Sequence, residues 1–476
     1  MTVETTQPFI NGQSVTVADT YDNIDPATGR SLGPVARSGE REIDQAVEAA
    51  TKAQLQWNRT TPEQRARVLT GIADLIEGDL EELALLESED TGKPLSQART
   101  DAVVCARYFR FYGHAIDSYY ADTIPLAPDQ HVYTRREPFG VVGSIIAWNY
   151  PMQLLARAAA PAIATGNATI VKPADETPRT AVRIARMAVE AGLPSGVFNV
   201  VPGIGAEAGA ALTMHHGVQH LGFVGSTQVG STIAAAAAKR VVPAVLELGG
   251  KSAQVVFPDA DLDTAALFAT KAILQNAGQT CSAGSRLLVH ESIHDELMTK
   301  VADNFGKVSM GPGINDPDLG PLISTKQQDR VKRMVGAVTQ GTVVVGGDAP
   351  GEGDLAAGAY FSPTLIDGVD PRSEIAQEEV FGPVLVAARF DTEEEAIALA
   401  NGTEYALLGA VWTSSLSRAH RMAAAIQAGQ VYVNTYGAGG GVELPFGGFK
   451  KSGYGREKGV EALDAYTQTK TVVIKL

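Results

Sequence analysis

The segment NAGQTCSAGSR (residues 276–286) presents Cys281 among small and polar neighbours, and the 476-residue chain has only one other cysteine, Cys105. A thiolate attacks carbon electrophiles well, but an ordinary cysteine has a pKa of about 8.5 and needs an electropositive or amide-lined setting to ionise near neutral pH. Gly278 and Gly284 leave room for a substrate and for close approach of the backbone. The pattern indicates a nucleophile, with a small buried hydrophobic residue as the alternative.

Two polar side chains at the ends of apolar runs could assist such a nucleophile. Glu247 lies at the end of the run AVLEL (244–248), where a carboxylate usually acquires a raised pKa, as a general base requires. Its alternative role is to cap local backbone amides. Asn149 follows Trp148 at the end of VVGSIIAWN (141–149), where its amide could donate to a developing oxyanion or simply end the strand in a turn.

Three glycine-rich stretches are candidates for phosphate binding. GGKS (249–252) resembles the end of a nucleotide-binding P-loop, but that loop needs a glycine where this chain has Val245. PGIGAEAG (202–209) follows a strand and opens a helix, although its spacing differs from the Rossmann fingerprint. GSTQVG (225–230) has the same position between a strand and a helix, and its amides and hydroxyls could hold a pyrophosphate. Either of the last two could be only a tight turn.

Two charged residues follow another expected strand, ATIVKP (168–173). Lys172 would project from the sheet edge where a cofactor lies, and Asp175 could accept hydrogen bonds from ribose hydroxyls and would repel a 2′-phosphate. The alternatives are a solvated lysine and an exposed turn carboxylate. His215 and His216 have no recognised metal-ligand spacing, so we predict that they end a helix and expect no metal.

From residue 139 onward, short apolar runs alternate with helical segments. We expect strands at 141–149, 168–173, 198–203, 220–226 and 244–248, and helices at 151–165, 178–191, from 205, and at 228–239. Such a series predicts a parallel sheet covered on both faces, with ligands along the edge where the strands end. A second α/β unit begins after Glu247 and extends to VYVN (431–434), so we place a domain boundary near residue 248.

Helical periodicity precedes the sheet, and two β-prone pieces lie apart from it. Apolar spacing predicts two amphipathic helices, over 43–50 and 68–83, and Pro62 suits the first helical position of the second. A third helix is expected over 96–118. The polar-alternating segments 131–138 and 467–476 would be exposed strands, which associate unless a partner covers them, so we expect a homo-oligomer.

Composition limits the class of partner. The net charge of -15 disfavours nucleic acid and anionic membrane surfaces, and the sequence has no apolar run long enough to span a membrane. The N-terminal segment has no apparent targeting peptide, and two cysteines imply no disulfide framework. We therefore expect a cytoplasmic protein that acts on a small molecule.

Seven segments occur in the order that they have in the aldehyde dehydrogenase superfamily, and the chain resembles that superfamily over nearly its whole length. They are AWNYP (147–151), VKPADETP (171–178), FVGSTQVG (223–230), LELGGKS (246–252), GQTCSAGSR (278–286), EEVFGPV (378–384) and PFGGFKKSGYGRE (445–457). The resemblance implies an α/β fold in three parts. These are a Rossmann-type dinucleotide-binding domain (1–119 and 139–247), an α/β catalytic domain (248–441), and a small β element that bridges subunits of a dimer or tetramer (120–138 and 459–476).

The resemblance also implies a mechanism. Cys281 would attack the aldehyde to give a thiohemiacetal whose oxyanion is held by the Asn149 side chain and the Cys281 backbone N–H. Hydride transfer to the nicotinamide would leave a thioester, and water activated by Glu247 would hydrolyse it to the carboxylic acid. A coenzyme A acylating dehydrogenase, which Glu247 disfavours, and a structural protein on the same fold are the alternatives.

Cofactor contacts are implied position by position. Lys172 and Asp175 would bind the adenosine ribose, and Glu379 the nicotinamide ribose. The remaining contacts would be Gly225 and Ser226 at the pyrophosphate, with Trp148 and Phe381 flanking the cofactor. Relatives that prefer NAD usually have glutamate where this chain has Asp175, so NAD is expected and tolerance of NADP is open.

A second departure is Ala158, where many relatives have a lysine in a polar network with the residue matching Glu457. Arg157 takes a position that is often aromatic, and a cation there disfavours cationic substrates and suits a carboxylate, a hydroxyl or an aromatic face. We expect an aromatic or oxygen-bearing semialdehyde, unless Arg157 only forms a salt bridge outside the channel. The expected channel, with the loop 436–443 at its mouth, is lined by Tyr150, Leu154, Arg157, Thr280, Ser282 and Phe446.

Overall fold

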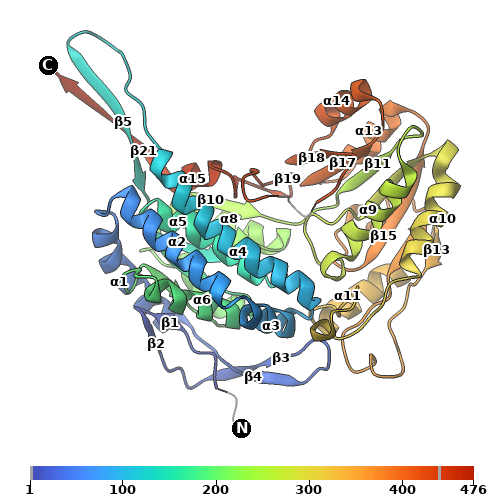
Figure 1. Cartoon of the computed structure of the whole chain (residues 1–476), viewed down its shortest axis with the longest axis horizontal. Helices are drawn as coiled ribbons and strands as arrows, with labels where there is room; N and C mark the ends of the chain where they lie inside the picture. Colours follow the sequence, from blue (N-terminus) through green and yellow to red (C-terminus); the bar gives the residue numbers. More distant parts are fainter. Residues whose placement is uncertain (1–3, 438–440) are drawn as a thin grey trace.

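The computed structural model describes residues 4–437 and 441–476. Two lobes, each built on its own sheet with helices against it, lie side by side, and an arm of two long strands projects from the first lobe (Figure 1). No helix of the described residues is both long enough and apolar enough to cross a membrane.

The first sheet has the strand order β2-β1-β8-β7-β6-β9-β10-β20, and its five central strands are parallel. The parallel series predicted from residue 139 is therefore confirmed. The strands are β1 (Phe9–Ile10), β2 (Gln13–Ser14), β6 (Val141–Ile145), β7 (Ala168–Lys172), β8 (Phe198–Val200), β9 (His220–Val224), β10 (Ala244–Glu247) and β20 (Gly453–Tyr454).

Helices cover both faces of this sheet, as the alternating pattern predicts. One apolar core contains residues of the helices α2 through α6. A second core packs α1, α7 and α8 against the opposite face of the sheet. The helices are α1 (Glu40–Trp57), α2 (Pro62–Gly78), α3 (Leu80–Thr91), α4 (Leu95–Ala115), α5 (Pro151–Ala164), α6 (Arg179–Glu190), a π-helical turn (Gly205–Gly209), α7 (Ala210–Met214), α8 (Thr227–Arg240) and α15 (Glu461–Ala465).

The prediction of one continuous helix over 68–83 is wrong at its C-terminal end. α2 ends at Gly78, and the apolar residues that continue the periodicity belong to α3. Glycine is a weak helix former, and the Asp79 carboxylate accepts a hydrogen bond from Arg183 Nε of α6 at 2.6 Å, which holds the break. The predicted position of Pro62 as the first residue of α2 is confirmed.

The second sheet has the order β13-β14-β15-β12-β11-β17-β18, with only β13 antiparallel to its neighbour. Its strands are β11 (Ala253–Val256), β12 (Arg286–His290), β13 (Thr342–Val345), β14 (Thr364–Asp367), β15 (Val384–Phe390), β17 (Leu408–Trp412) and β18 (Gln430–Val433). Its helices are α9 (Leu262–Leu274), α10 (His294–Phe305), α11 (Thr325–Gly336), α12 (Glu374–Gln377), α13 (Glu393–Asn401) and α14 (Leu416–Ala425).

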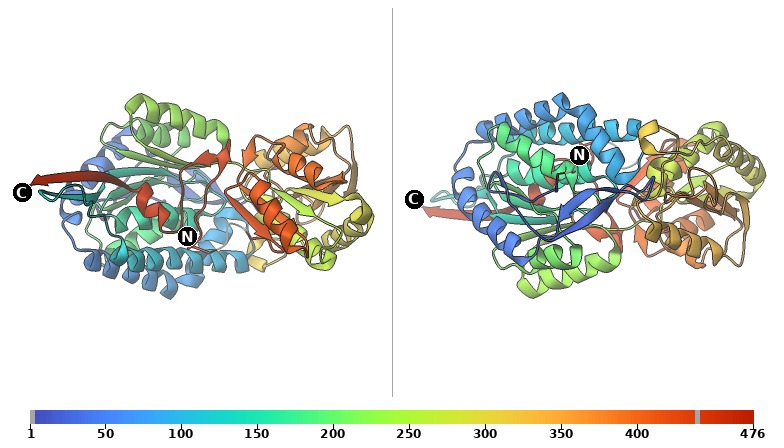
Figure 2. Two further views of the ribbon diagram at one scale, coloured as in Figure 1. Left: turned by 90° about the horizontal axis from the view of Figure 1, so that it is seen from above. Right: turned by 90° about the horizontal axis from the view of Figure 1, so that it is seen from below.

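The two β-prone pieces expected outside the cores pair with each other. β5 (Gln130–Pro138) runs antiparallel to β21 (Thr467–Lys475) along nine paired positions, and together they form the projecting arm (Figure 1). A second ribbon, β3 (Thr20–Ile24) with β4 (Ser31–Ala36), passes beneath both lobes (Figure 2). Its turn reaches the second lobe, where Ala359 N donates to Pro26 O at 2.9 Å.

The two lobes are also joined by a late segment of the chain. β19 (Phe449–Lys450) pairs with β16 (Tyr405–Ala406) of the second lobe, and β20 then pairs with β10 of the first. The carboxyl ends of β6, β9 and β10 therefore face the second lobe. Asn149, Ser226 and Glu247, three of the predicted functional residues, lie at or just after these strand ends.

Candidate active site

A pocket of about 340 Å³ lies between the two lobes. The first lobe contributes the segments after β6, β9 and β10, and the second contributes α11 and the loops around Cys281 and Glu379. The predicted site residues among its walls are Trp148, Asn149, Tyr150, Leu154, Arg157, Gly225, Ser226, Glu247, Cys281, Glu379 and Phe381. Folding thus brings all three predicted catalytic residues to one cavity.

The loop that carries Cys281 enters the pocket through unusual backbone. Asn276, Ala277 and Gly278 follow one another with φ of 49°, 53° and 73°, in the left-handed region that is costly for residues other than glycine. A Cβ at Gly278 would lie 2.0 Å from Gly382 O, so only glycine fits there. Asn276 N donates to Gln97 Oε1 at 3.0 Å, which ties the loop to α4.

Cys281 is half-buried, and burial raises the pKa of its thiol to about 12, although the charge of Arg157 opposes the increase. Arg157 therefore supplies the electropositive setting that was predicted for this cysteine. Its effect on the thiol pKa is smaller than the effect of desolvation. The free thiol is protonated at neutral pH, and a base must take up its proton before attack.

Asn149 is buried against the same loop. Its Nδ2 donates to Gln279 O at 2.9 Å, which leaves the second amide hydrogen for another acceptor. Its backbone oxygen accepts from Lys93 Nζ at 3.0 Å and from Asn276 Nδ2 at 2.8 Å. Sequence reasoning missed Lys93 and the amide of Asn276, because nothing in their local pattern indicates contact with a strand end so distant in the chain.

Glu247 is 2% exposed, and neither oxygen of its carboxylate has a hydrogen-bond partner within the described residues. Burial raises the pKa of this carboxyl well above its ordinary value, the charge of Glu457 adds to the increase, and Arg157 opposes it. The raised pKa expected for a carboxylate at an apolar strand end is therefore found. Gly447 approaches so closely that a Cβ there would lie 2.9 Å from Glu247 Oε1.

A cluster of charges surrounds Glu247. Arg157 Nη2 lies 2.5 Å from Glu457 Oε2, and the Arg157 guanidinium lies 4.8 Å from the centre of the Phe446 ring. Lys458 Nζ lies 5.3 Å from the same ring centre, and burial lowers the Lys458 pKa to about 7. Arg157 thus both forms a salt bridge and lines the pocket, which combines the two roles that the sequence left open.

The cofactor candidates at the mouth of the pocket form a cradle. Ser226 caps the 14-residue helix α8 by accepting from Val229 N at 3.3 Å, so the free amides of this N-terminus open next to Gly225. Helix N-termini of this kind bind phosphate groups. Two aromatic residues, Trp148 and Phe381, stand with ring centres 5.2 Å apart.

The acidic residue of the cradle is held by the backbone of the crossing between β10 and β11. Glu379 Oε1 accepts from Gly250 N at 2.9 Å, and burial raises its pKa to about 7. A Cβ at Gly249 would lie 2.8 Å from the same carboxylate, so a side chain there would displace Glu379. The cradle therefore combines a helix N-terminus of the kind that binds phosphate, two aromatic rings packed edge to face, and a carboxylate. This combination fits a dinucleotide.

Lys172 and Asp175 lie at the end of β7 and are not among the walls of the pocket. They form an ion pair with each other, and Asp175 Oδ2 also accepts from Gly205 N at 3.3 Å. Lys172 is 2% exposed, so it is not the solvated lysine of the alternative interpretation. The pair lies at the sheet edge where the adenosine end of a dinucleotide was expected.

Three predicted substrate residues lie behind the walls. Thr280 Oγ1 shares a hydrogen bond of 2.8 Å with the Tyr150 hydroxyl. The Phe446 ring packs against the guanidinium of Arg157, which lines the pocket. Ser282 is buried, and its backbone oxygen accepts from the Tyr436 hydroxyl at 2.6 Å, a contact that the sequence did not predict. Part of the predicted mouth, residues 438–440, lies outside the described residues.

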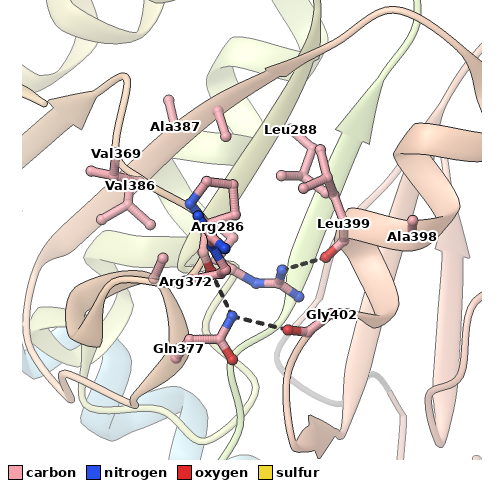
Figure 3. Close-up of a pocket in the computed structure, with 13 residues that line it drawn as sticks. Arg286, Leu288, Val369, Arg372, Gln377, Val386, Ala387, Ala398, Leu399 and Gly402 are labelled. Carbon is pink, nitrogen blue, oxygen red and sulfur yellow. Dashed lines mark hydrogen bonds between the residues drawn. The ribbon is translucent and has the colours of Figure 1, made fainter. Parts of the chain in front are cut away.

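A separate cavity of about 230 Å³ lies in the second lobe, among β12, β15 and α13 (Figure 3). The guanidinium of Arg286 donates to Leu399 O at 2.7 Å, and Gln377 Nε2 donates to Gly402 O at 2.9 Å. Arg286 and Gln377 are therefore engaged by backbone, and most of the cavity walls are apolar. None of the predicted site residues lines it.

Comparison with known proteins identifies the family of the chain. The chain matches the model of the aldehyde dehydrogenase family over residues 13–472. DhaS of Bacillus subtilis (strain 168) is 39% identical, over 98% of this chain and 95% of its own length.

Solved structures agree over the whole fold. An indole-3-acetaldehyde dehydrogenase in complex with NAD+ is 42% identical, with a TM-score of 0.97 over 100% of this chain and 97% of its own. The aldehyde dehydrogenase KauB from Pseudomonas aeruginosa is 41% identical, with the same TM-score and coverage. The chain therefore belongs to the aldehyde dehydrogenase family and is an NAD(P)-dependent aldehyde dehydrogenase.

Proposed function

We propose that this enzyme oxidises an aldehyde to the carboxylic acid through a covalent intermediate on Cys281, which water activated by Glu247 hydrolyses. The observation that carries this function is the meeting of Cys281, Asn149 and Glu247 in one pocket from three distant segments. Each has the chemistry that its role requires: a nucleophilic sulfur, an amide donor and a carboxylate whose pKa burial raises.

The nucleotide would be held by the cradle at the mouth and by the Lys172–Asp175 pair beyond it. NAD, when bound, supplies the hydride acceptor. Asp175 favours NAD over NADP, because its carboxylate accepts from ribose hydroxyls and repels a 2′-phosphate. The cradle consists of Trp148, Gly225, Ser226, Glu379 and Phe381.

The first half of the reaction forms a carbon–sulfur bond. The Cys281 sulfur attacks the carbonyl carbon after its thiol proton has passed to solvent water, so that Glu247 in the same pocket stays available for the second half. The carbonyl oxygen takes the negative charge and accepts hydrogen bonds from Asn149 Nδ2 and the Cys281 N–H. Departure of hydride from this carbon regenerates the carbonyl as a thioester.

The second half breaks the same bond. Glu247 takes a proton from water, the resulting hydroxide attacks the thioester carbon, and the Cys281 thiolate leaves with the acid as product. A coenzyme A acylating enzyme would transfer the acyl group to a thiol instead and would need no such base. A free carboxylic acid formed without coenzyme A separates the two.

For the substrate, we propose an aromatic aldehyde or an oxygen-bearing semialdehyde. Arg157 places a permanent cation in the pocket wall, 4.8 Å from the centre of the Phe446 ring, which disfavours a cationic substrate. Tyr150 and Leu154 add aromatic and apolar surface to the pocket. Saturation kinetics with benzaldehyde, succinic semialdehyde and betaine aldehyde test this class, and a clear preference for betaine aldehyde contradicts it.

We also propose that the arm joins subunits of a homo-oligomer, a dimer or a tetramer. Its β21 strand exposes Val473 and Ile474, and Leu476 at its end is 77% exposed. An unpaired strand edge with apolar side chains is a site for association. Light scattering of a chain lacking 467–476 tests this: a particle as large as that of the full chain contradicts it.

Turnover is the decisive measurement. The purified protein, with NAD and then NADP, is assayed with the aldehydes above by absorbance of the reduced cofactor, beside a Cys281→Ala variant. We expect reduction of NAD that disappears in the variant. Turnover that survives Cys281→Ala would exclude the covalent route.

A further inference from the structure

Lys93 lies between α3 and α4 with a fully buried side chain. Its Nζ pairs with Glu87 Oε1 at 2.8 Å and with Asp101 Oδ2, and both carboxylates are also buried. Such a cluster contributes little to stability by itself, since well-packed apolar residues often replace buried ion pairs without loss. Stability alone therefore does not explain why three ionisable groups are buried here.

The third hydrogen of the ammonium group leads to the active site. Lys93 Nζ donates to the backbone oxygen of Asn149 at 3.0 Å and lies 4.4 Å from the centre of the Tyr150 ring. Asn276 Nδ2 donates to the same oxygen at 2.8 Å. The peptide group between Asn149 and Tyr150 is thus fixed by two donors, one from the helical layer and one from the nucleophile loop.

The orientation of this peptide determines where the Asn149 side chain points. Asn149 Nδ2 donates to Gln279 O at 2.9 Å, and Asn276 Nδ2 lies 3.3 Å from that oxygen as well. A closed set of hydrogen bonds therefore links the backbone and the amide of Asn149 to the loop two residues before Cys281. Lys93 anchors this set to the body of the first lobe.

The carboxylates of the cluster hold the chain that follows Asn149. Glu87 Oε2 accepts from Met152 N at 3.1 Å, and Asp101 Oδ1 accepts from Gln153 Nε2 at 2.6 Å. Both donors belong to the first turn of α5. One buried ammonium group thus organises the backbone at Asn149 and the start of the helix after it.

We infer that Lys93 is a positioning residue of the oxyanion site, which aims the Asn149 amide at the oxygen of the intermediate on Cys281. Lys93 acts through Asn149 and does not touch the substrate, and this role rests on the proposed function. Errors of about 1 Å in such groups cost about 100-fold in rate, so a positional role has a large kinetic signature.

The test compares two matched variants, so that no buried carboxylate loses its cation. The control carries Glu87→Gln and keeps the buried Lys93–Asp101 pair, and the test variant carries Glu87→Gln, Asp101→Asn and Lys93→Met, so that neither variant leaves a buried charge without a partner. The measurement is the single-turnover rate of NADH formation. We expect this rate to fall at least about 30-fold from control to test variant, as for a displaced oxyanion donor. NAD affinity and iodoacetamide labelling of Cys281 should change less than about threefold, whereas general damage to the fold would alter both.

A double-mutant comparison identifies the route of the effect. If Lys93 acts through Asn149, then Lys93→Met should cost less than about threefold when Asn149→Ala is already present. Equal costs in both backgrounds, or a single-turnover rate within threefold of the control, would overturn the role. If the test variant does not fold, Asn276→Ala removes the other donor to the same oxygen, and an unchanged rate there overturns it equally. Loss of the proposed function itself is distinguishable, because Asn149→Ala would then leave the rate unchanged.

Discussion

Two buried charge clusters flank the pocket, and they differ in how their polar groups are satisfied. In the Lys93 cluster, all three ammonium hydrogens have acceptors, two carboxylates and the Asn149 carbonyl. In the cluster around Glu247, no described residue makes a hydrogen bond to that carboxylate, and the Lys458 pKa is lowered to about 7. A satisfied network fixes geometry, whereas an unsatisfied one keeps groups ready to exchange protons. The Lys93 cluster on one side of the cavity thus fixes the position of active-site groups, and the Glu247 cluster on the other side supplies reactive groups.

The largest expected effect comes from removing the reactive carboxylate. Glu247→Gln should lower steady-state turnover by about 10³-fold, because no base then activates water for thioester hydrolysis. Stopped-flow absorbance should still show NADH formation within the first turnover. Glu404→Gln changes an exposed carboxylate paired with Lys451 and should leave turnover intact. An unaltered steady-state rate in Glu247→Gln would show that this cluster does not supply the base that activates water.

Breaking the cation of the same cluster should destabilise the fold. Arg157→Met leaves Glu457 buried without its partner, and loss of one member of a buried pair costs about 3–5 kcal/mol. Urea denaturation measures the free energy of unfolding, which Glu457→Gln in the same chain should largely restore. If the single variant is as stable as the wild type, the pair is not buried in solution.

The lowered pKa of Lys458 predicts a pH dependence. Because the folded state releases this proton near pH 7 and the unfolded state near 10.5, the unfolded state binds more protons between these values. The contribution of Lys458 to the free energy of unfolding therefore rises with pH in that window, by at most about 1.4 kcal/mol per pH unit. Urea midpoints at pH 7 and pH 9 should rise less in Lys458→Met than in the wild type. Parallel changes would mean that Lys458 has an ordinary pKa.

The smallest effect is expected at a charge pair that is partly exposed. Asp175 pairs with the buried Lys172 but is itself about one-third exposed. Asp175→Asn should raise the kcat/KM for NADP relative to that for NAD by roughly fivefold, since one unit of charge repulsion near water is worth about 1 kcal/mol. An unchanged cofactor ratio would remove Asp175 from the nucleotide site. The predicted effects thus become smaller from the buried charges to the partly exposed Asp175.

Local sequence patterns were sufficient to predict the parallel sheet and the three residues assigned to catalysis. Glu247 ends β10 and Asn149 follows the end of β6 by four residues, because the strand predicted over 141–149 ends at Ile145, and parallel strands bring their carboxyl ends to one edge. Cys281 stood out by its glycine-rich surroundings. In each case the chemistry and the structural signal lie within a few residues of each other.

What the sequence did not predict depends on contacts between distant segments. Lys93 follows Gly92 in TGKP, which has the composition of a solvated turn, and its burial depends on carboxylates of α3 and α4 and on a strand end 56 residues away. The Cys281 pKa was likewise unpredictable, because desolvation is set by the second lobe packing against the first. The break at Asp79 was missed because apolar spacing continues across it while Arg183 holds it from another helix.

The ribbon beneath the two lobes has a mechanical consequence. The lobes are joined by the crossing after β10, by the returning segment that carries β19 and β20, and by the turn at Pro26 that bonds to Ala359. A rotation of one lobe about any single connection would strain the other two. These three connections brace the pocket, so we expect the nucleotide to enter and leave by movement of side chains in its walls, such as Phe381, with the two lobes keeping their separation.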